Sequence, residues 1–352
     1  MIDPDAPTLA LENDRGLELI PVRRLLDLDP IARFDLGPGD RILVGPGDSV
    51  SPGLGLAERQ RDPRVDEGPP VAEPEEIDSL PLEAGDWWPG DGHEAAGPLR
   101  RRQPRTPAGE LLHPSDGRWR IAAGGHVDVL EAPAAGTVVE AVPGRGVAVR
   151  LAGPALIGAF AAGTSTRGRL ERVLGESGLR GALDVGRAGA VLVVDGRIDS
   201  EAIIRARATG VRGVVASGLA SKDLRDLRGS EARQRASLQP LAPFAVLILD
   251  GTVRRTIAGP VARLLAALEG RQVAIVVDPP RLVFTASDPP AASWPDDWVR
   301  VLGGELAGRE GRWLRSAGLH RFAAGVHLEA AAIALDDGTV AVVPLADLER
   351  LA

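Results

Sequence analysis

Residues 190–277 alternate continuous apolar runs with segments of helical periodicity. The runs are apolar along most of their length, without a polar residue at every second position, and they lie at residues 190–194, 211–216, 244–249 and 273–277. The segments of helical periodicity between them predict helices over 200–209, 221–238 and 260–268, with Ser221 as the N-cap of the second. Strands that are buried on both faces carry unbroken apolar runs. The pattern therefore predicts a central three-layer α/β domain with a parallel sheet, assigned to residues 180–284.

The stretches 17–60 and 109–153 show a different pattern, in which short apolar runs alternate with Gly, Pro and Asp. This pattern predicts short strands joined by tight turns. Residues 61–108 are dominated by proline, glycine and charge, so we expect a linker or a disordered insertion there. A second linker is predicted over 285–297, and residues 298–352 are again β-rich. The expected fold is thus a multidomain α/β plus all-β architecture.

Two glycine-containing motifs refine this picture. Asp336-Asp337-Gly338 separates two apolar runs and predicts a hairpin turn. Residues 158–168 are rich in Gly and Thr, but they lack the G-K-[ST] ending of a phosphate-binding loop and precede no clear helix. We therefore favour a plain loop for residues 158–168.

The negative charge of the chain is concentrated in one segment. The formal net charge is −8, and residues 61–99 alone contain eleven acidic and two basic residues. A chain that is acidic overall is poorly suited to wrap nucleic acid, because phosphates would be repelled on average. A short basic cluster follows the acidic segment directly and comprises Arg100, Arg101, Arg102 and Arg105. Its first three arginines are a candidate interaction site.

Composition excludes several kinds of chemistry. The chain has no cysteine, which excludes disulfides, thiol catalysis and cysteine-based zinc sites. Its five histidines show no metal-ligating spacing, so we expect no metal and no cofactor. We also identify no catalytic residue. No apolar run approaches the length of a membrane span, and the first residues do not form a secretory signal, so a cytoplasmic location without membrane contact is predicted.

One segment of the α/β region is a candidate anion-binding site. An apolar strand leads into a helix at Ser217, Gly218, Ser221 and Lys222. Backbone N–H groups at such places bind anions. Lys222 is also the only lysine in the chain. The alternative is a surface lysine in the first turn of the helix. Asp195 and Asp250 end other strands and would either line the same crevice or serve only in the turns that follow, with the turn role favoured.

Two stretches of the predicted N-terminal β module share a family resemblance. Residues 47–57 (GDSVSPGLGLA) and 130–139 (LEAPAAGTVV) resemble the conserved turns of biotinyl/lipoyl-like domains. The resemblance implies one barrel-sandwich hybrid formed by residues 36–57 and 109–151, with 61–108 inserted between its halves. A carried biotin or lipoyl group requires a lysine on a hairpin, and Lys222 lies elsewhere. A swinging-arm carrier is therefore excluded.

The C-terminal region carries a second resemblance. Residues 299–313 (VRVLGGELAGREGRW) resemble a KOW motif, the hairpin core of small SH3-like barrels that bind RNA or protein. The resemblance implies that Val299, Val301 and Trp313 pack the core of a barrel over 298–352. Arg309, Arg312 and Arg315 would form a local basic patch. Residues 285–352 nevertheless contain ten acidic and six basic residues, so a protein partner is favoured over RNA.

Three functions remain open at this point. The favoured one is a non-catalytic adaptor or scaffold that binds proteins through its β modules. The second is a KOW-type factor that contacts RNA or the transcription or translation machinery. The third is an enzyme or sensor for a small anionic or phosphorylated molecule, which would use the strand-end crevice.

Overall fold

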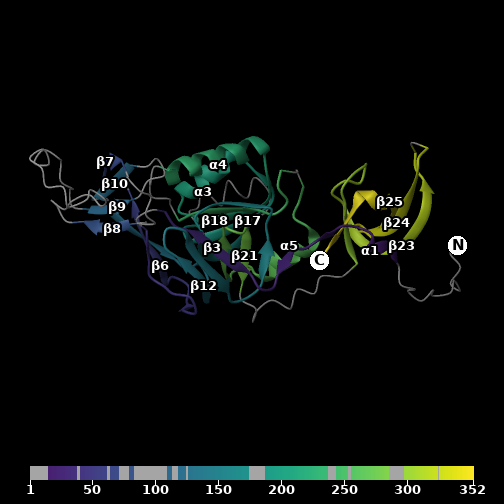
Figure 1. Cartoon of the computed structure of the whole chain (residues 1–352). Coiled ribbons are helices and arrows are strands. Elements are labelled where there is room, and N and C mark those ends of the chain that lie inside the picture. Colours follow the sequence, from purple (N-terminus) through teal and green to yellow (C-terminus); the bar gives the residue numbers. More distant parts are fainter. Residues whose placement is uncertain are drawn as a thin grey trace, which may run out of the picture.

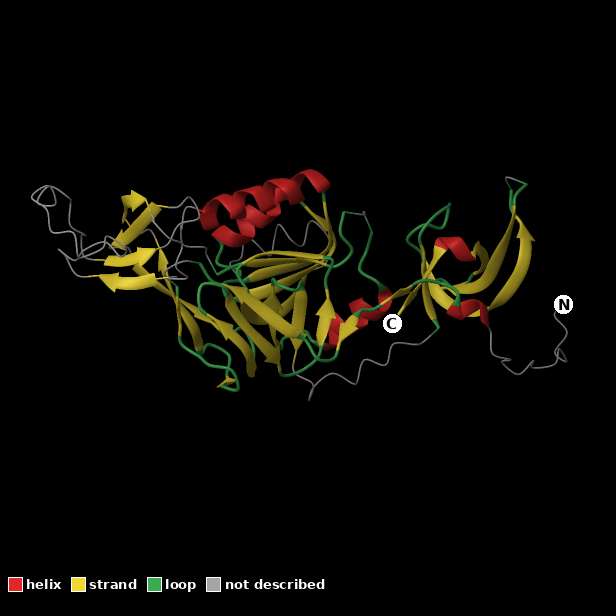
Figure 2. Cartoon of the chain, in the orientation of Figure 1, coloured by secondary structure: helices red, strands yellow, loops and turns green. Residues whose placement is uncertain are grey.

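The computed structural model describes most of the chain, and the described residues form mainly β-structure in five sheets with a few helices (Figures 1 and 2). The ranges described are 15–37, 40–61, 64–70, 79–82, 109–112, 118–123, 126–173, 187–236, 243–252, 255–284, 297–323 and 325–352. No helix in these ranges is both long and apolar enough to cross a bilayer.

The largest sheet has nine strands and occupies the centre of the chain. Across it the strands follow the order β15 (Phe160–Gly163), β19 (Ala245–Ile248), β18 (Gly213–Leu219), β17 (Ala190–Ile198), β16 (Thr166–Val173), β20 (Gln272–Val276), β21 (Arg281–Phe284), β14 (Ala155–Ile157) and β2 (Leu26–Asp27). The four strands from β19 to β16 are parallel. Antiparallel strands flank them on both sides, so the sheet is mixed.

Helices lie on both faces of this sheet (Figure 1). α3 (Ser200–Ala208) and α4 (Ser221–Ala236) cover one face, and α5 (Gly259–Ala267) covers the other. Successive side chains of β17 alternate between the two resulting cores: Val191 and Val193 face α5, whereas Leu192 and Val194 face α3 and α4. This alternation explains why the strand is apolar at every position.

Three local predictions for this region are wrong. The run at 273–277 forms a strand, β20, but it pairs antiparallel with β16. Residues 158–168 are not a plain loop, because they contribute β15 and the start of β16. Ser221 is the first helical residue of α4, and the carbonyl of Ala220 accepts the first helical hydrogen bond, from Leu224 N–H.

The glycine content of residues 158–168 has a packing cause. Gly163 has φ +103°, and a Cβ built on it would lie 2.1 Å from the carbonyl oxygen of Phe244 on the neighbouring chain segment. Glycine is therefore required there by the close approach of two backbones within a sheet. The sequence alone does not distinguish this requirement from loop flexibility.

Two smaller sheets combine segments that are far apart in the sequence. One has the order β3 (Ile31–Asp35), β13 (Gly146–Leu151), β12 (Gly136–Val142) and β5 (Ser49–Val50), and the other has the order β11 (His126–Glu131), β6 (Gly55–Arg61) and β4 (Arg41–Ile42). Both contribute to one core, which also includes Val276 and Val283 of the central sheet. Residues 31–61 and 126–151 thus pair with one another across the intervening insertion.

A further sheet is formed by the inserted residues. Its order is β7 (Arg64–Pro70), β10 (Arg118–Ala123), β9 (Gly109–Leu112) and β8 (Ser79–Leu82). The expectation of a linker or disordered insertion over 61–108 is therefore wrong for β7 and β8. β9 and β10 pair with these strands and not with the rest of the stretch 109–153. Hydrogen bonds between backbone groups can form a sheet in a segment rich in proline, glycine and charge, and such pairing cannot be inferred from composition.

The C-terminal residues form a six-stranded sheet. Its order is β1 (Val22–Arg23), β26 (Leu348–Leu351), β22 (Trp298–Val301), β23 (Glu310–Arg321), β24 (His327–Leu335) and β25 (Val340–Pro344), with α1 (Arg15–Glu18) and η2 (Leu345–Asp347) beside it. Val299, Val301 and Trp313 are buried in its core, as the resemblance implied. Among the described strands no pairing joins β1 to β25, so the sheet is not a closed barrel.

The N-terminal segment connects this sheet to the central one. Ile20 packs in the C-terminal core and β1 pairs with β26, although residues 17–60 were assigned to the N-terminal β module. Directly afterwards Leu25 N–H donates to the carbonyl of Ala352, and β2 joins the edge of the nine-stranded sheet. The assignment of residues 17–27 to the N-terminal β module is therefore wrong, because this segment contributes to the C-terminal sheet and to the central sheet.

The predicted hairpin turn at Asp336-Asp337-Gly338 is confirmed, since it connects β24 to β25. Gly338 has φ +81°, a backbone conformation that favours glycine. Hydrogen bonds from Thr339 and Arg309 hold the pKa of Asp337 well below its usual range. The turn therefore keeps a charged carboxylate that fixes Arg309 beside it.

We predict that Gly311→Ala destabilises the C-terminal sheet by about 1–3 kcal/mol. A Cβ at this position would lie 2.1 Å from the carbonyl oxygen of Ala334 on β24, so the two strands would have to separate. Gly229→Ala is the matched control, because its Cβ would meet only the flexible end of Arg233 within helix α4. That control should stabilise the chain by about 0.5–1 kcal/mol. Urea unfolding measures both, and equal effects would contradict the close approach of β23 to β24.

Candidate functional site

The residues predicted to bind an anion do not form a single pocket. Ser217 is completely buried within β18, and its hydroxyl donates to the carbonyl of Arg255. Gly218 also lies within β18, whereas Ser221 and Lys222 are exposed on the first turn of α4. None of the four lines either of the cavities described below.

Asp195 and Asp250 make contacts beyond the turns that follow their strands. Asp195 Oδ1 accepts a hydrogen bond of 2.8 Å from Ile257 N–H, and Asp250 is the centre of a group of arginines. Each carboxylate lines a small cavity, and Ile257 lines both cavities. A glycine with positive φ follows each of them, which agrees with the turn role. The expectation that both line the crevice of Ser217 and Lys222 is wrong, because they line separate cavities to which neither residue contributes.

The arginine group surrounds Arg300 of β22, whose side chain is only 1% exposed. Its Nη1 lies 2.9 Å from Asp250 Oδ1 of the central domain, and its Nε donates to Glu310 Oε1 at 2.8 Å. Glu310 Oε2 accepts hydrogen bonds from Gly259 N–H, at the start of α5, and from the Trp298 indole. One buried cation thus connects the C-terminal sheet to two elements of the central domain.

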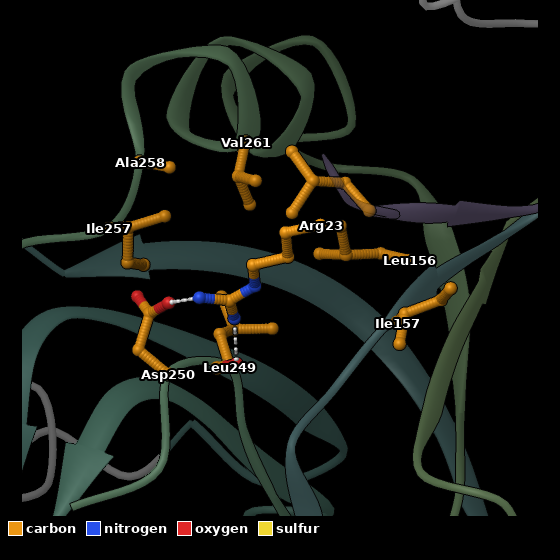
Figure 3. A pocket seen from close by; sticks show the side chains of 9 residues that line it. Arg23, Leu156, Ile157, Leu249, Asp250, Ile257, Ala258 and Val261 are labelled. Atoms are coloured by element: carbon orange, nitrogen blue, oxygen red, sulfur yellow. Dashed lines mark hydrogen bonds and ion pairs between the residues drawn. The ribbon is translucent and has the colours of Figure 1, made fainter. Parts of the chain in front are cut away.

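Arg23 makes a second connection at the same place. Its Nη1 lies 2.6 Å from Asp250 Oδ1, and its Nη2 donates to the carbonyl of Leu249 at 2.7 Å (Figure 3). Arg23 belongs to β1 of the C-terminal sheet, whereas Leu249 and Asp250 follow β19 of the central sheet. The cavity beside this ion pair is otherwise mainly apolar and has room for about one water molecule.

The cluster contains three arginines and three carboxylates, and we refer to it as the Arg300 cluster. Its members are Arg23, Arg255, Arg300, Asp250, Glu310 and Glu349. Burial tends to lower the pKa of Arg300, but the charges of Asp250 and Glu310 outweigh burial and raise it. Burial and the charge of Arg300 lower the pKa of Arg255. The positive charge of Arg255 is thus the least well neutralised in the cluster. Its carboxylate partner, Asp250, lies 3.8 Å away and also pairs with two other arginines.

The geometry of the Arg300 cluster is that of an interface and not of a reaction centre. The partners of Asp250 and Glu310 are arginines, a backbone N–H group and the Trp298 indole, and the adjacent cavity is too small for a metabolite. Within the described ranges no group of His, Asp and Glu side chains has the geometry of a metal site. The cluster therefore joins two sheets.

The predicted basic patch is mostly neutralised. Arg309 lies 2.6 Å from Asp337 and 3.0 Å from Asp336, and Arg312 lies 2.8 Å from Asp297. Arg315 is exposed and makes a long contact with the carbonyl of Ser316. Arg100, Arg101 and Arg102 lie outside the described residues.

A second candidate site is an exposed apolar surface on the C-terminal sheet. Of the sixteen large apolar side chains that are exposed in the described part of the chain, seven lie between residues 302 and 342. Six of these seven lie on β23, β24, β25 or the turn that joins β23 to β24, and we call them the C-terminal apolar surface: Leu314, Leu319, Val326, Leu328, Val340 and Val342. By strand register Leu328, Val340 and Val342 share one face of the sheet, and Leu319 points to the other. Apolar side chains that gather on neighbouring exposed strands are candidates for a protein–protein contact.

Sequence reasoning missed both features for physical reasons. The Arg300 cluster joins residues that are far apart in the chain, and a local pattern cannot pair them. One signal was present: Arg300 lies between Val299 and Val301 in an apolar strand, which indicates a buried cation that needs carboxylates. The apolar surface depends on which face of each strand is covered. That can be known only when the order of the strands in the sheet is known.

A scan against protein families found no match to this chain, and a search of curated proteins also found none.

We predict that Arg300→Met lowers the free energy of unfolding by about 3–5 kcal/mol, because it leaves Glu310 buried without a cation and removes one of the three arginines around Asp250. The control is Arg312→Met, which removes an exposed ion pair and should cost at most about 1 kcal/mol. Chemical denaturation of both variants provides the measurement. A loss at Arg300 no greater than that at Arg312 would show that the cluster does not hold the two sheets together.

Proposed function

We propose that this chain is a non-catalytic adaptor or scaffold that works in the cytoplasm and binds other proteins through its β modules. The observation that carries the proposal is the C-terminal apolar surface, which covers three neighbouring strands. Exposed apolar side chains on adjacent strands gain free energy when a protein covers them. The described polar clusters, by contrast, are used in internal contacts.

The two family resemblances are consistent with this function and remain part of the proposal. We propose that residues 31–61 and 126–151 correspond to a barrel-sandwich hybrid without a carrier lysine, and that the C-terminal sheet is an open relative of the SH3-like fold. Both kinds of domain present loops and strand edges to partners. The rigid connection through the Arg300 cluster would hold two such surfaces in a fixed relation, as a scaffold requires.

RNA binding through a KOW-type surface is less well supported. Arg309 and Arg312 each lie beside carboxylates of the same sheet, so most of the predicted basic patch is not free to contact phosphates. The chain as a whole is also acidic. A phosphate backbone would therefore meet few unpaired cations there.

A small-molecule function has the least support. Ser217 is buried and hydrogen-bonded, and Lys222 is exposed on the helix. The groups that were predicted to converge on an anion therefore lie apart, with Ser217 in the interior and Lys222 on the surface. The cavities beside Asp195 and Asp250 are small, and the second is lined by Arg23 and Asp250 of the Arg300 cluster.

The test of the adaptor function is chemical cross-linking of the full chain in its native cells, followed by mass spectrometry. We expect defined protein partners whose recovery falls at least about tenfold with Val342→Asp, because a carboxylate there would be desolvated on binding. Val139→Asp is the matched control, since both valines are 39% exposed and Val139 lies on β12. Cross-links mainly to RNA, or equal recovery with both variants, would contradict the proposal.

A further inference from the structure

One edge of the C-terminal sheet is β25, and no described strand pairs along its outer side (Figure 1). Four of the described edge strands have five or more residues: β3, β7, β11 and β25. The first three carry charged side chains, whereas β25 contains none. Charges on an edge strand hinder the addition of a further strand, so β25 is the one of the four that is open to such an addition.

Alternate residues of β25 direct their backbone groups away from the sheet. Leu335 and Thr339 form a hydrogen-bonded pair at the turn between β24 and β25. In an antiparallel ladder such pairs alternate with pairs that are not hydrogen-bonded, so every second residue of β25 points its N–H and C=O groups outward. These residues are Val340, Val342 and Pro344, and proline has no N–H. The donors of this edge are therefore the N–H groups of the two valines, and no described strand accepts from them.

The side chains of the same two valines lie on the exposed face of the sheet. Val340 and Val342 are opposite Ala334 and Ala332, on the face away from the core that contains Ile333. They are 63% and 39% exposed. β-branched residues pack well across neighbouring strands, so an added strand with valines at matching positions would cover both side chains.

The sequence of β25 is complementary to itself. When two copies pair antiparallel with Ala341 opposite Ala341, Val340 of each copy lies opposite Val342 of the other. Each of these pairs exchanges two hydrogen bonds, so the outward N–H and C=O groups of both valines are all satisfied. In a register centred on Val342, the Val340 carbonyl would face Pro344 and would find no donor. The strand therefore favours the register centred on Ala341.

No like charges meet along this edge when a second copy adds to it. Residues 339–343, which would pair, are Thr-Val-Ala-Val-Val. A second copy of β11, by contrast, would bring further carboxylates beside Asp128 and Glu131. The contact between two β25 strands uses the same surface on both copies, so it closes in a two-fold dimer and leaves no β25 edge for a third copy.

We propose that two copies of this chain associate through β25, which pairs antiparallel with β25 of the second copy about a two-fold axis at Ala341. The two C-terminal sheets then form one continuous sheet. Val340 and Val342 of each copy are covered by the same valines of the other. This dimer goes beyond the adaptor function, because it concerns the association of the chain with itself.

Sedimentation equilibrium of the full chain over a range of concentrations tests the association. The average mass should rise with concentration from that of one chain to that of two and no further. Val340→Lys should weaken the dimer at least about tenfold, because the lysine would be desolvated beside Val342 of the second copy. Val127→Lys is the matched control, since Val127 is 62% exposed and lies on the edge strand β11.

Three results of this measurement would contradict the dimer. The mass could stay at that of one chain at every concentration, or it could rise beyond that of two chains. The two lysine variants could also weaken the association equally, which would show that β25 is not the contact.

Cysteine trapping tests the register, and the lack of native cysteines makes it specific. With oxidised glutathione, Ala341→Cys should give a disulfide-linked dimer, because the Cα atoms of two residues directly opposed in a non-hydrogen-bonded pair lie about 4.5 Å apart. Val342→Cys is the control, because its two cysteines would be offset along the strands and too far apart for a disulfide. Equal or faster cross-linking of Val342→Cys would refute the proposed pairing.

The dimer and the adaptor function fail in different ways. If the chain dimerises through β25 but no other protein is cross-linked to it in cells, the dimer stands and the adaptor function is wrong. If the chain remains a monomer while other proteins are recovered in a manner that depends on Val342, the adaptor function stands and the dimer is wrong.

Discussion

The arrangement of this chain depends on a buried ion pair between Arg300 and Asp250. Arg300 lies in an apolar strand of the C-terminal sheet, and Asp250 follows a buried strand of the central sheet. Neither charge is stable in the interior alone, because desolvation without a partner is strongly unfavourable. Each sheet therefore supplies the counter-charge for the buried charge of the other, and Glu310 extends the contact to the start of α5.

The ends of the chain strengthen the same junction. β1 pairs in parallel with β26, and Leu351 packs in the core that also contains Leu25 and the side chains of α5. Arg23 then reaches Asp250 from this strand. Segments from the two ends of the chain thus meet at the place where the two sheets join.

Sequence patterns predicted the secondary structure best where one local rule governs it. The apolar runs of β17, β18 and β19 and the helices between them follow from burial of strands on both faces. The turn at Gly338 follows from its need for positive φ. The patterns failed where polar or glycine-rich segments form strands, as in β7, β8, β15 and β16, because backbone pairing does not require apolar side chains. They also failed for residues 17–23, whose partner strand β26 lies at the other end of the chain.

The sequence by itself determined the helical layers and four of the nine strands of the central sheet, because each depends on local periodicity. The resemblance of residues 299–313 to a KOW motif implied the burial of Val299, Val301 and Trp313. Only the tertiary structure decided which charges meet. It placed Arg300 beside Asp250 and Glu310, neutralised Arg309 and Arg312, and separated Ser217 from Lys222. The physical reason is that a pair of charges depends on distance in space, and sheet order brings together residues that no local pattern relates.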